Sequence, residues 1–155
     1  MLKTRIKMPQ SLTKLYVHIV FSTKERLPLL ADVNKSELHN FISKIFIEHD
    51  SQVIKINNMS DHIHILINQS KKHDISTLIK HVKQSSSKWL KTKTNSRFSW
   101  QRGYSAFSIS QSNLDVVTQY IENQEEHHRN FSYQDELRKL LKAYDIEHNE
   151  EYLWD

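Results

Sequence analysis

The sequence predicts one α+β domain whose four strands form an antiparallel sheet. Four short segments are rich in β-branched and aromatic residues, which favours strands. Two longer segments have apolar residues at helical spacing, so the order is β-α-β-β-α-β, and two further helical segments follow. The length of 155 residues suits a single domain, with a core over about 12–131 and a C-terminal helix and acidic tail over about 132–155.

The first half of the chain is expected to contain a strand, a helix and a hairpin. Lys14–Ser22 is dense in β-branched and aromatic residues and predicts a strand. Asn34–Asp50 predicts a helix, because its apolar residues recur at helical spacing. Ser51–Asn57 and His62–Asn68 flank a polar turn and predict a β-hairpin. Alternation in the first of these two strands puts Val53 with Lys55 on one face and Ile54 with Ile56 on the other.

The second half is expected to contain one more strand and three helices. Asp74–Lys91 predicts a helix, and Tyr104–Ser110 predicts the fourth strand. Ser112 and Asp115 form a capping-box pattern that opens the next helix, and the last helix covers roughly Tyr133–Tyr144. The first six elements match the ferredoxin-like (RRM-like) pattern, in which both helices lie on one face of the sheet. The other face is open for a site or an extra helix.

The composition excludes several classes of protein. Cysteine is absent, so the chain has no disulfide framework, no thiolate metal site and no cysteine nucleophile. No apolar run approaches the roughly 20 residues that span a bilayer, so we expect no membrane segment. The N-terminus is basic but lacks the apolar stretch of a signal peptide, so the expected location is the cytoplasm.

The net charge of +4 is unevenly distributed. Residues 71–102 hold nine Lys and Arg against one acid, whereas residues 115–155 hold eleven acids against four Lys and Arg. A basic block with aromatic residues favours single-stranded nucleic acid as a partner, although a solvated helix face has the same composition, and Trp89 and Trp100 are expected to be core residues. The candidate DNA contacts are Lys80, Lys83, Lys88, Lys91, Lys93, Arg97 and Arg102.

Two histidines stand out inside the third predicted strand. In the segment His62-Ile-His64, the period of a strand puts both imidazoles on one face of the sheet. Two imidazoles at this spacing can bind one metal ion, but a chain with ten histidines also contains such a pair by chance. Asp61 precedes the pair and either orients a histidine or closes the turn.

Tyr120 and Gln124 are four residues apart in the helix after the fourth strand, so they share a face. A tyrosine hydroxyl is a weak nucleophile unless it or its target is activated, and a divalent cation that polarises a phosphoryl oxygen activates the target. Gln124 offers a neutral oxygen that could complete a two-imidazole site. Without the histidine pair, a half-buried tyrosine and a surface glutamine would be the simpler interpretation.

Together and in this order, these signals resemble the single-tyrosine HUH transposases of the insertion sequence 200/605 family and the related REP-associated tyrosine transposases. The resemblance covers the chain from about residue 12 to the acidic end. Its most specific element is the His-hydrophobic-His pair, followed about 55 residues later by Tyr-x-x-x-Gln. The segments that carry it are His18–Leu30, Asp61–Leu66, Trp100–Ser110 and Tyr120–His128.

The resemblance implies a metal-assisted endonuclease and strand transferase that acts on single-stranded DNA. His62, His64 and Gln124 would bind one divalent ion, Mg²⁺ or Mn²⁺. Tyr120 would attack a phosphodiester and give a 5′-phosphotyrosine link and a free 3′-OH. A later attack by a 3′-OH on that link would reseal the strand, which requires no ATP and no nucleotide cofactor.

The resemblance also implies the partners of the chain. Family members recognise imperfect hairpins at the ends of the element and work as homodimers. In many of them the tyrosine helix of one subunit completes the site of the other, and the short connection Ser110–Asn113 leaves both cis and trans placements of Tyr120 open. His127 and His128 match the family pattern but receive no catalytic role, because they either contact DNA or are polar residues near a helix end.

Three other functions are compatible with parts of the sequence. A domesticated or inactive relative would bind single-stranded DNA or a hairpin without cleaving it. A single-strand RNA-binding module would display aromatic residues on the open sheet face, where this sequence places histidines and aliphatic residues. A metal-dependent hydrolase would need a water-activating base, and no carboxylate apart from Asp61 is expected near the histidines.

Overall fold

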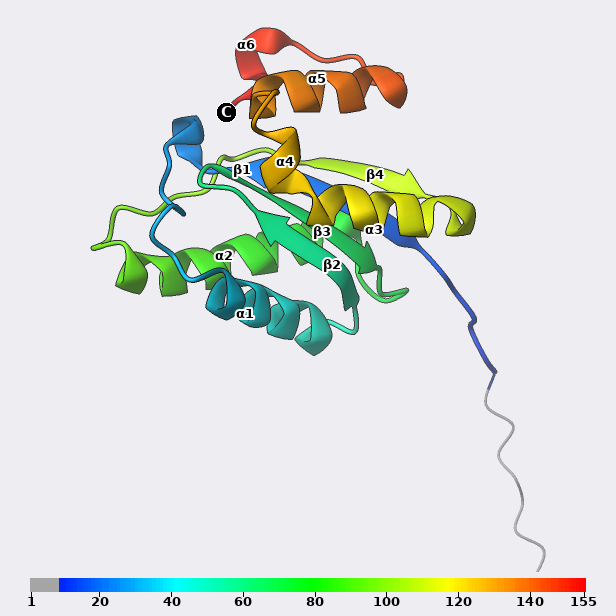
Figure 1. The fold of residues 1–155 in the computed structure, drawn as a ribbon. Helices are drawn as coiled ribbons and strands as arrows, with labels where there is room; N and C mark the ends of the chain where they lie inside the picture. The colour runs from blue at the N-terminus through cyan, green and yellow to red at the C-terminus, as the bar shows by residue number, and fades with distance from the viewer. Residues whose placement is uncertain (1–8) are drawn as a thin grey trace, which may run out of the picture.

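The computed structural model describes residues 9–155, and Figure 1 shows one sheet with helices on both of its faces. The basic segment 1–8, on which the expected lack of a signal peptide depends, lies outside the described residues. All strand pairs are antiparallel and the strand order is β2-β3-β1-β4, which agrees with the predicted ferredoxin-like pattern. The strands are β1 (Tyr16–Ser22), β2 (Gln52–Asn58), β3 (His62–Asn68) and β4 (Ser105–Ile109).

Two helices cover the sheet face to which the odd-numbered residues of β1 and β3 point. A short 3₁₀ turn, η1 (Lys24–Arg26), follows β1. The helices α1 (Lys35–Glu48) and α2 (Ile75–Lys93) begin after Asn34 and Asp74, whose side chains accept hydrogen bonds from backbone N–H groups of the first turn. The main core fills the space between these helices and the sheet, and it includes Ile19, Phe21, Leu38, Ile42, Phe46, Ile63, Ile65 and Leu78.

The second face, which the predicted pattern leaves open, is covered by the C-terminal elements (Figure 1). The helix α3 (Leu114–Glu122) packs on Leu66 of β3 through Ile121. The helix α5 (Tyr133–Ala143) packs on Phe107 of β4 through Leu137. The expectation of extra helices is therefore confirmed. These elements are η2 (Gln111–Asn113), α3 (Leu114–Glu122), α4 (Gln124–His127), α5 (Tyr133–Ala143) and α6 (Glu150–Leu153).

The predicted alternation of β2 is wrong because this strand contains an irregularity. Its register against β3 shifts between Val53 and Lys55. A β-bulge inserts one residue and so changes which side chains share a face. As a result, Val53 and Ile56 both pack against the main core, whereas Ile54 packs against the cluster beneath α3.

The predicted capping box at the start of α3 does not form. Asn113 is the N-cap residue, and its side chain makes no capping hydrogen bond. Ser112 lies one residue earlier, inside η2, and its hydroxyl is 3.0 Å from the hydroxyl of Ser110. The 3₁₀ turn therefore moves the start of the helix by one residue and takes Ser112 out of the capping position.

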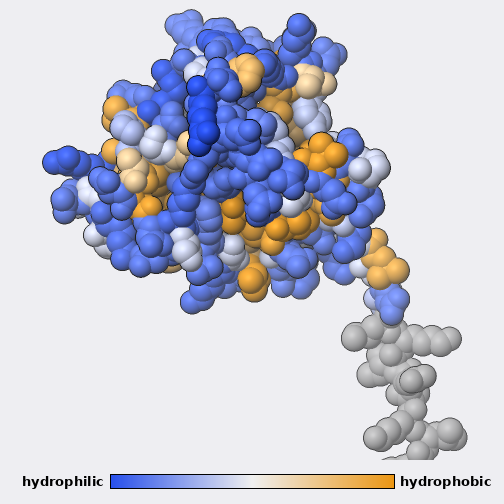
Figure 2. All heavy atoms as spheres, in the orientation of Figure 1, coloured by the Kyte–Doolittle hydropathy of each residue, from blue (hydrophilic) through white to orange (hydrophobic). Residues whose placement is uncertain are grey.

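The surface of the molecule is mainly hydrophilic on the face shown in Figure 2, where hydrophobic side chains form small separate patches. Such scattered exposed hydrophobic residues are ordinary for a folded protein. Among residues 9–155, no helix combines the length and the apolar character that a membrane crossing requires.

Candidate active site

His62 and His64 begin β3 and point to the face that the C-terminal helices cover. Their side chains are buried, with exposed fractions of 1% and 0%. Between them, Ile63 points to the main core on the other face, as the strand period predicts. In the sheet, His62 lies opposite Ser22 and His64 lies opposite Val20. Both imidazoles are therefore held by a central strand and cannot turn to solvent.

Asp61 orients the first of these histidines. Nδ1 of His62 donates a hydrogen bond to Oδ1 of Asp61 at 2.7 Å. This contact leaves Nε2 of His62 as the ring atom that faces the rest of the cluster. The backbone carbonyl of Asp61 also accepts a hydrogen bond from the amide of Thr23 at 2.8 Å, so the residue serves the turn as well.

Glu136 of α5 lies at the centre of the cluster. Its Oε1 atom is 2.8 Å from Nε2 of His64. The Nε2 atoms of His128 and His62 lie 3.1 and 3.4 Å from the same oxygen. Each of these four residues offers one metal-binding atom, and the four atoms all lie within 4.8 Å of one another. The cluster is therefore compact enough for one ion.

The other carboxylate oxygen, Oε2 of Glu136, connects Tyr120 and Gln124 to the histidines. It accepts hydrogen bonds from the Tyr120 hydroxyl and from Nε2 of Gln124, the latter at 3.2 Å. Oε1 of Gln124 lies 3.4 Å from Nε2 of His62 and 3.0 Å from Nε2 of His128. Although α3 ends and α4 begins between Tyr120 and Gln124, both side chains reach the same carboxylate. Gln124 is fully buried and is not a surface residue.

The electrostatics of the cluster keep Glu136 ionised and Tyr120 neutral. Burial opposes ionisation of Glu136, but the nearby His64 and hydrogen bonds from His128 and His62 hold the pKa of this carboxyl well below its usual range. Burial first, and Glu136 second, raise the pKa of the Tyr120 phenol above its usual value. The phenol is therefore poised as a hydrogen-bond donor, with Glu136 as its acceptor.

The two strand histidines differ in basicity although they share one carboxylate. Burial lowers the pKa of His62, but hydrogen bonds to Asp61 and Glu136 outweigh this effect, so the net shift is upward. Burial dominates at His64 and lowers its pKa. A neutral imidazole is the form that binds a metal ion, and His64 is the one that burial favours in this form.

His18 of β1 supports His64 from the sheet side. Its Nε2 atom lies 2.8 Å from Nδ1 of His64, and the two rings stack with their centroids 5.1 Å apart. Burial and the neighbouring His64 lower the pKa of His18 to about 3, so His18 is neutral at neutral pH. A neutral His18 can accept a hydrogen bond from Nδ1–H of His64, which leaves Nε2 of His64 able to bind a metal ion.

The donor atoms of this cluster fit a divalent cation. Three imidazole nitrogens, one carboxylate and the oxygen of Gln124 converge in a buried space. Imidazoles favour Mn²⁺ and other transition ions, whereas oxygen ligands suit Mg²⁺. The residue types are therefore compatible with either ion.

All four residues that the sequence singles out meet in one chain, but sequence reasoning misses two members of the cluster. The expectation that no carboxylate other than Asp61 lies near the histidines is wrong, because Glu136 contacts both. His128 carries a signal, since it follows Gln124 by one helical turn. Glu136 carries no local signal, because its position depends on how α5 docks on the sheet.

The predicted DNA-binding patch is not brought together with this cluster. Most of it lies on α2, on the opposite face of the sheet (Figure 1). Lys83 is used inside the fold, since its Nζ atom donates hydrogen bonds of 2.8, 3.2 and 2.6 Å to the carbonyls of Gln101, Arg102 and Gly103. The exposed members are Lys80, Lys88, Lys91, Lys93, Arg97 and Arg102.

The two tryptophans of the basic block are packed, as expected. Trp100 is 7% exposed and lies edge-on to Phe21, with ring centroids 4.8 Å apart. Trp89 stacks on Phe41 at the same centroid distance. Phe107, on the second sheet face, is buried beneath α5. The exposed aromatic platform that a single-strand RNA-binding module needs is therefore covered.

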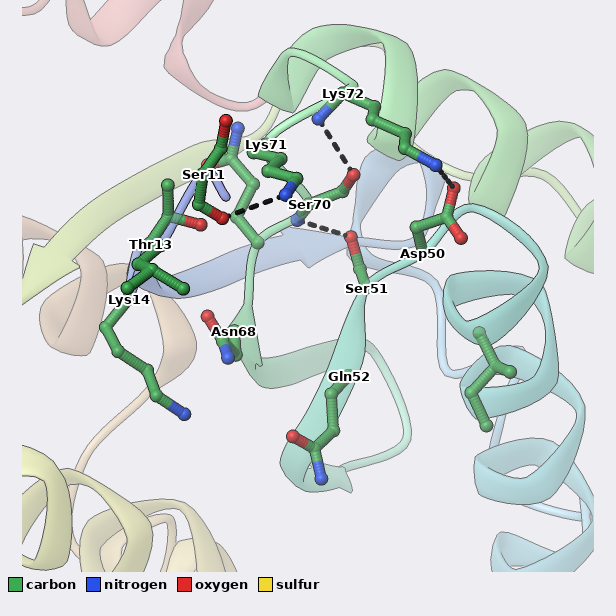
Figure 3. A pocket seen from close by; sticks show the side chains of 13 residues that line it. Ser11, Thr13, Lys14, Asp50, Ser51, Gln52, Asn68, Ser70, Lys71 and Lys72 are labelled. Carbon is green, nitrogen blue, oxygen red and sulfur yellow. Dashed lines mark hydrogen bonds and ion pairs between the residues drawn. The ribbon is translucent and has the colours of Figure 1, made fainter. Parts of the chain in front are cut away.

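A cavity of about 1,000 Å³ lies far from the histidine cluster, at the other end of β3 (Figure 3). At about 3.3 Å per residue, the strand separates its lining residue Asn68 from His62 by roughly 20 Å. Two of its lysines have partners: Lys71 donates to the carbonyl of Ser11 at 2.9 Å, and Lys72 pairs with Asp50 at 3.6 Å. The cavity contains none of the predicted site residues.

Comparisons with known proteins agree with the fold and identify the family. No curated protein matches the sequence significantly. The fold is similar to that of a Deinococcus radiodurans R1 protein assigned as a transposase, with a TM-score of 0.60 and 23% identity over 76% of this chain and 96% of the other. It is also similar to a REP-associated tyrosine transposase bound to a REP hairpin, with a TM-score of 0.59 and 14% identity over 79% of this chain and 73% of the other. Residues 11–124 match the family described as transposase IS200 like, and because this match covers most of the chain, the protein belongs to the IS200-like transposases.

Proposed function

We propose that this transposase cleaves and rejoins single-stranded DNA through a covalent link to Tyr120. The observation that carries the proposal is the contact of Tyr120 and Gln124 with the histidine cluster through Glu136 of the same chain. A nucleophile, a proton acceptor and a set of metal-binding atoms thus lie within one buried cluster. This combination is what phosphoryl transfer by a tyrosine requires.

The side chains supply the proton transfer of the reaction. The phenol oxygen of Tyr120 forms a bond to phosphorus as the bond from phosphorus to the 3′ oxygen breaks. Oε2 of Glu136, which accepts the hydrogen bond of the phenol, receives its proton, and that proton ends on the departing 3′ oxygen. The products are a 5′-phosphotyrosine and a free 3′-OH. Attack of a 3′-OH on this link reverses the exchange, so the bond energy is kept and no ATP is needed.

His62, His64 and Gln124 would hold one Mg²⁺ or Mn²⁺ ion, and His128 and Glu136 stand beside them as further ligands. A bound divalent ion would offset the negative charge of a non-bridging phosphate oxygen. Asp61 and His18 then keep the two strand imidazoles oriented toward that ion. We expect the substrate to be DNA with hairpin ends and the protein to act as a homodimer.

The test is a denaturing gel of the protein with labelled single-stranded DNA that tiles the flanks of its own gene, with and without Mn²⁺. We expect a metal-dependent covalent band with the wild type and none with Tyr120→Phe, because only the hydroxyl is removed. Tyr104→Phe is the matched control, since Tyr104 is 38% exposed and lies outside the cluster. A covalent band with Tyr120→Phe would overturn the assignment of the nucleophile. Hairpin binding in a native gel, without any covalent band in the denaturing gel, would favour a domesticated DNA-binding protein.

A metal-dependent hydrolase is the second candidate, and Glu136 is the observation that favours it. A carboxylate beside three imidazoles could activate water in place of tyrosine. The same gel separates the two candidates. Hydrolysis would release two free DNA fragments and would persist in Tyr120→Phe, whereas tyrosine attack leaves one fragment on the protein.

A further inference from the structure

A cavity of about 380 Å³ opens beside Tyr120, between α3 and α4 on one side and α5 on the other. Two of its lining residues, Tyr120 and Glu136, belong to the candidate active site. The others include His127, Phe131 and Lys139, none of which takes part in the reaction proposed above. Because Tyr120 is half-buried whereas His62 and His64 are fully buried, this cavity borders the nucleophile where a substrate can reach it.

The walls of the cavity suit a flat heteroaromatic ring. Phe131 is 42% exposed, although it is a large hydrophobic residue. The His127 ring lies 4.7 Å from the Tyr120 ring at an angle of 31°. Leu140 completes an apolar wall on α5. Aromatic side chains of this kind stack on nucleobases with little dependence on the base, because every base has a π-face.

Lys139 supplies the charge that a nucleotide requires. Its Nζ atom lies 3.7 Å from the centroid of the Phe131 ring. A cation–π contact at an exposed site is weak, so a base can take the place of the ammonium on the ring while Lys139 turns to a phosphate. One edge of the cavity thus offers a stacking surface and a cation, and the other edge offers the nucleophile.

The size of the cavity limits what it can hold. Small-molecule sites usually measure about 300–1,000 Å³, so this one lies at the lower end of that range. A cavity of about 380 Å³ has room for a single nucleotide but not for a base pair with its two backbones. A base must therefore leave the stack to enter, which is easiest in single-stranded DNA.

We propose that this cavity binds one unpaired nucleotide next to the scissile phosphate, with the base stacked on Phe131 and a phosphate paired with Lys139. The inference rests on the proposed function, because it assigns the nucleotide to the DNA that Tyr120 attacks. The cavity would make cleavage depend on a base that is present and unstacked at one position. It would thereby select single-stranded over double-stranded DNA.

The first experiment measures the rate of covalent adduct formation on DNA in which single bases near the cleaved bond are replaced by abasic sites. For the wild type, we expect roughly a tenfold loss at one position, which is the usual size of one stacking contact. Phe131→Ala should show a similar loss on intact DNA and no further loss on the abasic DNA. Lys139→Gln should slow the reaction on both intact and abasic DNA. Lys142→Gln, an exposed change on the same helix, should leave the rate on either DNA unchanged.

A second experiment separates failure of the cavity from failure of the proposed chemistry. Single-stranded DNA with 4-thiothymidine at successive positions is crosslinked to the full-length wild type by light, and the crosslinked peptides are mapped. We expect one position to crosslink to the peptide that contains Phe131. Crosslinking there without any covalent adduct would support the cavity and overturn the tyrosine chemistry. The opposite result would be a covalent adduct whose DNA crosslinks only to other peptides, together with a wild-type rate of adduct formation in Phe131→Ala. It would overturn the cavity and leave the chemistry intact.

Discussion

At the scale of single residues, Lys83 shows that a lysine in a basic block can serve the fold instead of a ligand. Its ammonium cannot bind a DNA phosphate without losing hydrogen bonds that it donates to three backbone carbonyls, at 2.8, 3.2 and 2.6 Å. The ammonium also lies over the ring of Phe21, with Nζ 4.9 Å from the centroid. The residue thus ties α2 to the segment before β4. Its charge is the same as that of its exposed neighbours, and only its position on the helix distinguishes it.

We therefore expect Lys83→Met to lower stability and to leave the salt dependence of DNA binding unchanged. Loss of the ammonium leaves three carbonyls without a donor, which should cost about 1–3 kcal/mol in the free energy of unfolding by urea. The matched control is Lys88→Met on the exposed side of α2, which should barely change stability. If Lys88 contacts a phosphate, its loss should reduce by about one the slope of the logarithm of the DNA-binding constant against the logarithm of the salt concentration. A reduced slope for Lys83→Met would show that Lys83 also contacts DNA.

At the scale of elements, α5 carries the residue that connects the whole cluster. Leu137 and Leu141 are 2% and 3% exposed and pack against the sheet beneath the helix. Glu136 precedes Leu137, so the packing of Leu137 sets the position of the Glu136 carboxylate. Ser132 caps the N-terminus of the helix, because its hydroxyl accepts a hydrogen bond from the amide of Asp135 at 3.2 Å.

Leu137→Ala should therefore impair both stability and chemistry. Removal of a fully buried leucine side chain costs about 2–5 kcal/mol, and the loosened helix should displace Glu136 from Tyr120. We expect a lower melting temperature in calorimetry and a slower covalent reaction at a temperature at which the variant is still folded. Lys142→Ala, on the exposed side of the same helix, should change stability by less than about 0.5 kcal/mol. A destabilised Leu137→Ala with the wild-type rate would mean that α5 does not position the carboxylate.

The sequence predicts the site residues of β3, α3 and α4 but not the one on α5. His62 with His64, and Tyr120 with Gln124, are found from the sequence because each pair obeys a local period, of a strand or of a helix. Glu136 cannot be found in this way, since it joins the cluster only when α5 packs on the sheet. Its position, like that of His128, also lies beyond residues 11–124, which match the family.

The fold itself is predicted well for a related reason. The odd-numbered residues of β3 are all isoleucine, so the sequence of this strand indicates which of its faces is buried in the main core. Errors occur where a single residue changes a local period. The bulge near Ile54 inverts part of β2, and the 3₁₀ turn at Ser112 removes the capping box. Both features depend on backbone geometry that composition does not encode.

At the scale of the whole molecule, the two faces of the sheet have different roles. α1 and α2 bury the main core on one face, and the C-terminal helices enclose the histidine cluster on the other (Figure 1). The exposed basic residues of α2 are thus separated from Tyr120 by the thickness of the sheet. At one end of the sheet His62 lies opposite Ser22, whose amide donates a hydrogen bond to Oε1 of Gln101, the residue before Arg102. We expect DNA that touches both to pass around this end.

The contacts on this second face favour one of the two placements of Tyr120 that the sequence leaves open. Within one chain, Tyr120 and Gln124 already contact Glu136, and Glu136 contacts His62 and His64. These contacts join all the residues of the cluster within one chain. We therefore expect a cis site, in which a protein needs an intact tyrosine and intact histidines in the same chain.

Co-expression of two inactive variants tests the cis site. Tyr120→Phe and His64→Gln should each form no covalent adduct with single-stranded DNA, and a mixture of the two should form none either, because no chain has a complete cluster. If the tyrosine helix instead served the partner in a two-fold dimer, mixed dimers would regain one intact site, or roughly a quarter of all sites. Co-expression of Tyr120→Phe with Tyr104→Phe is the control, since every Tyr104→Phe chain retains a complete cluster. Melting curves must show that His64→Gln is folded, because a site buried this deeply leaves little room for a misplaced amide.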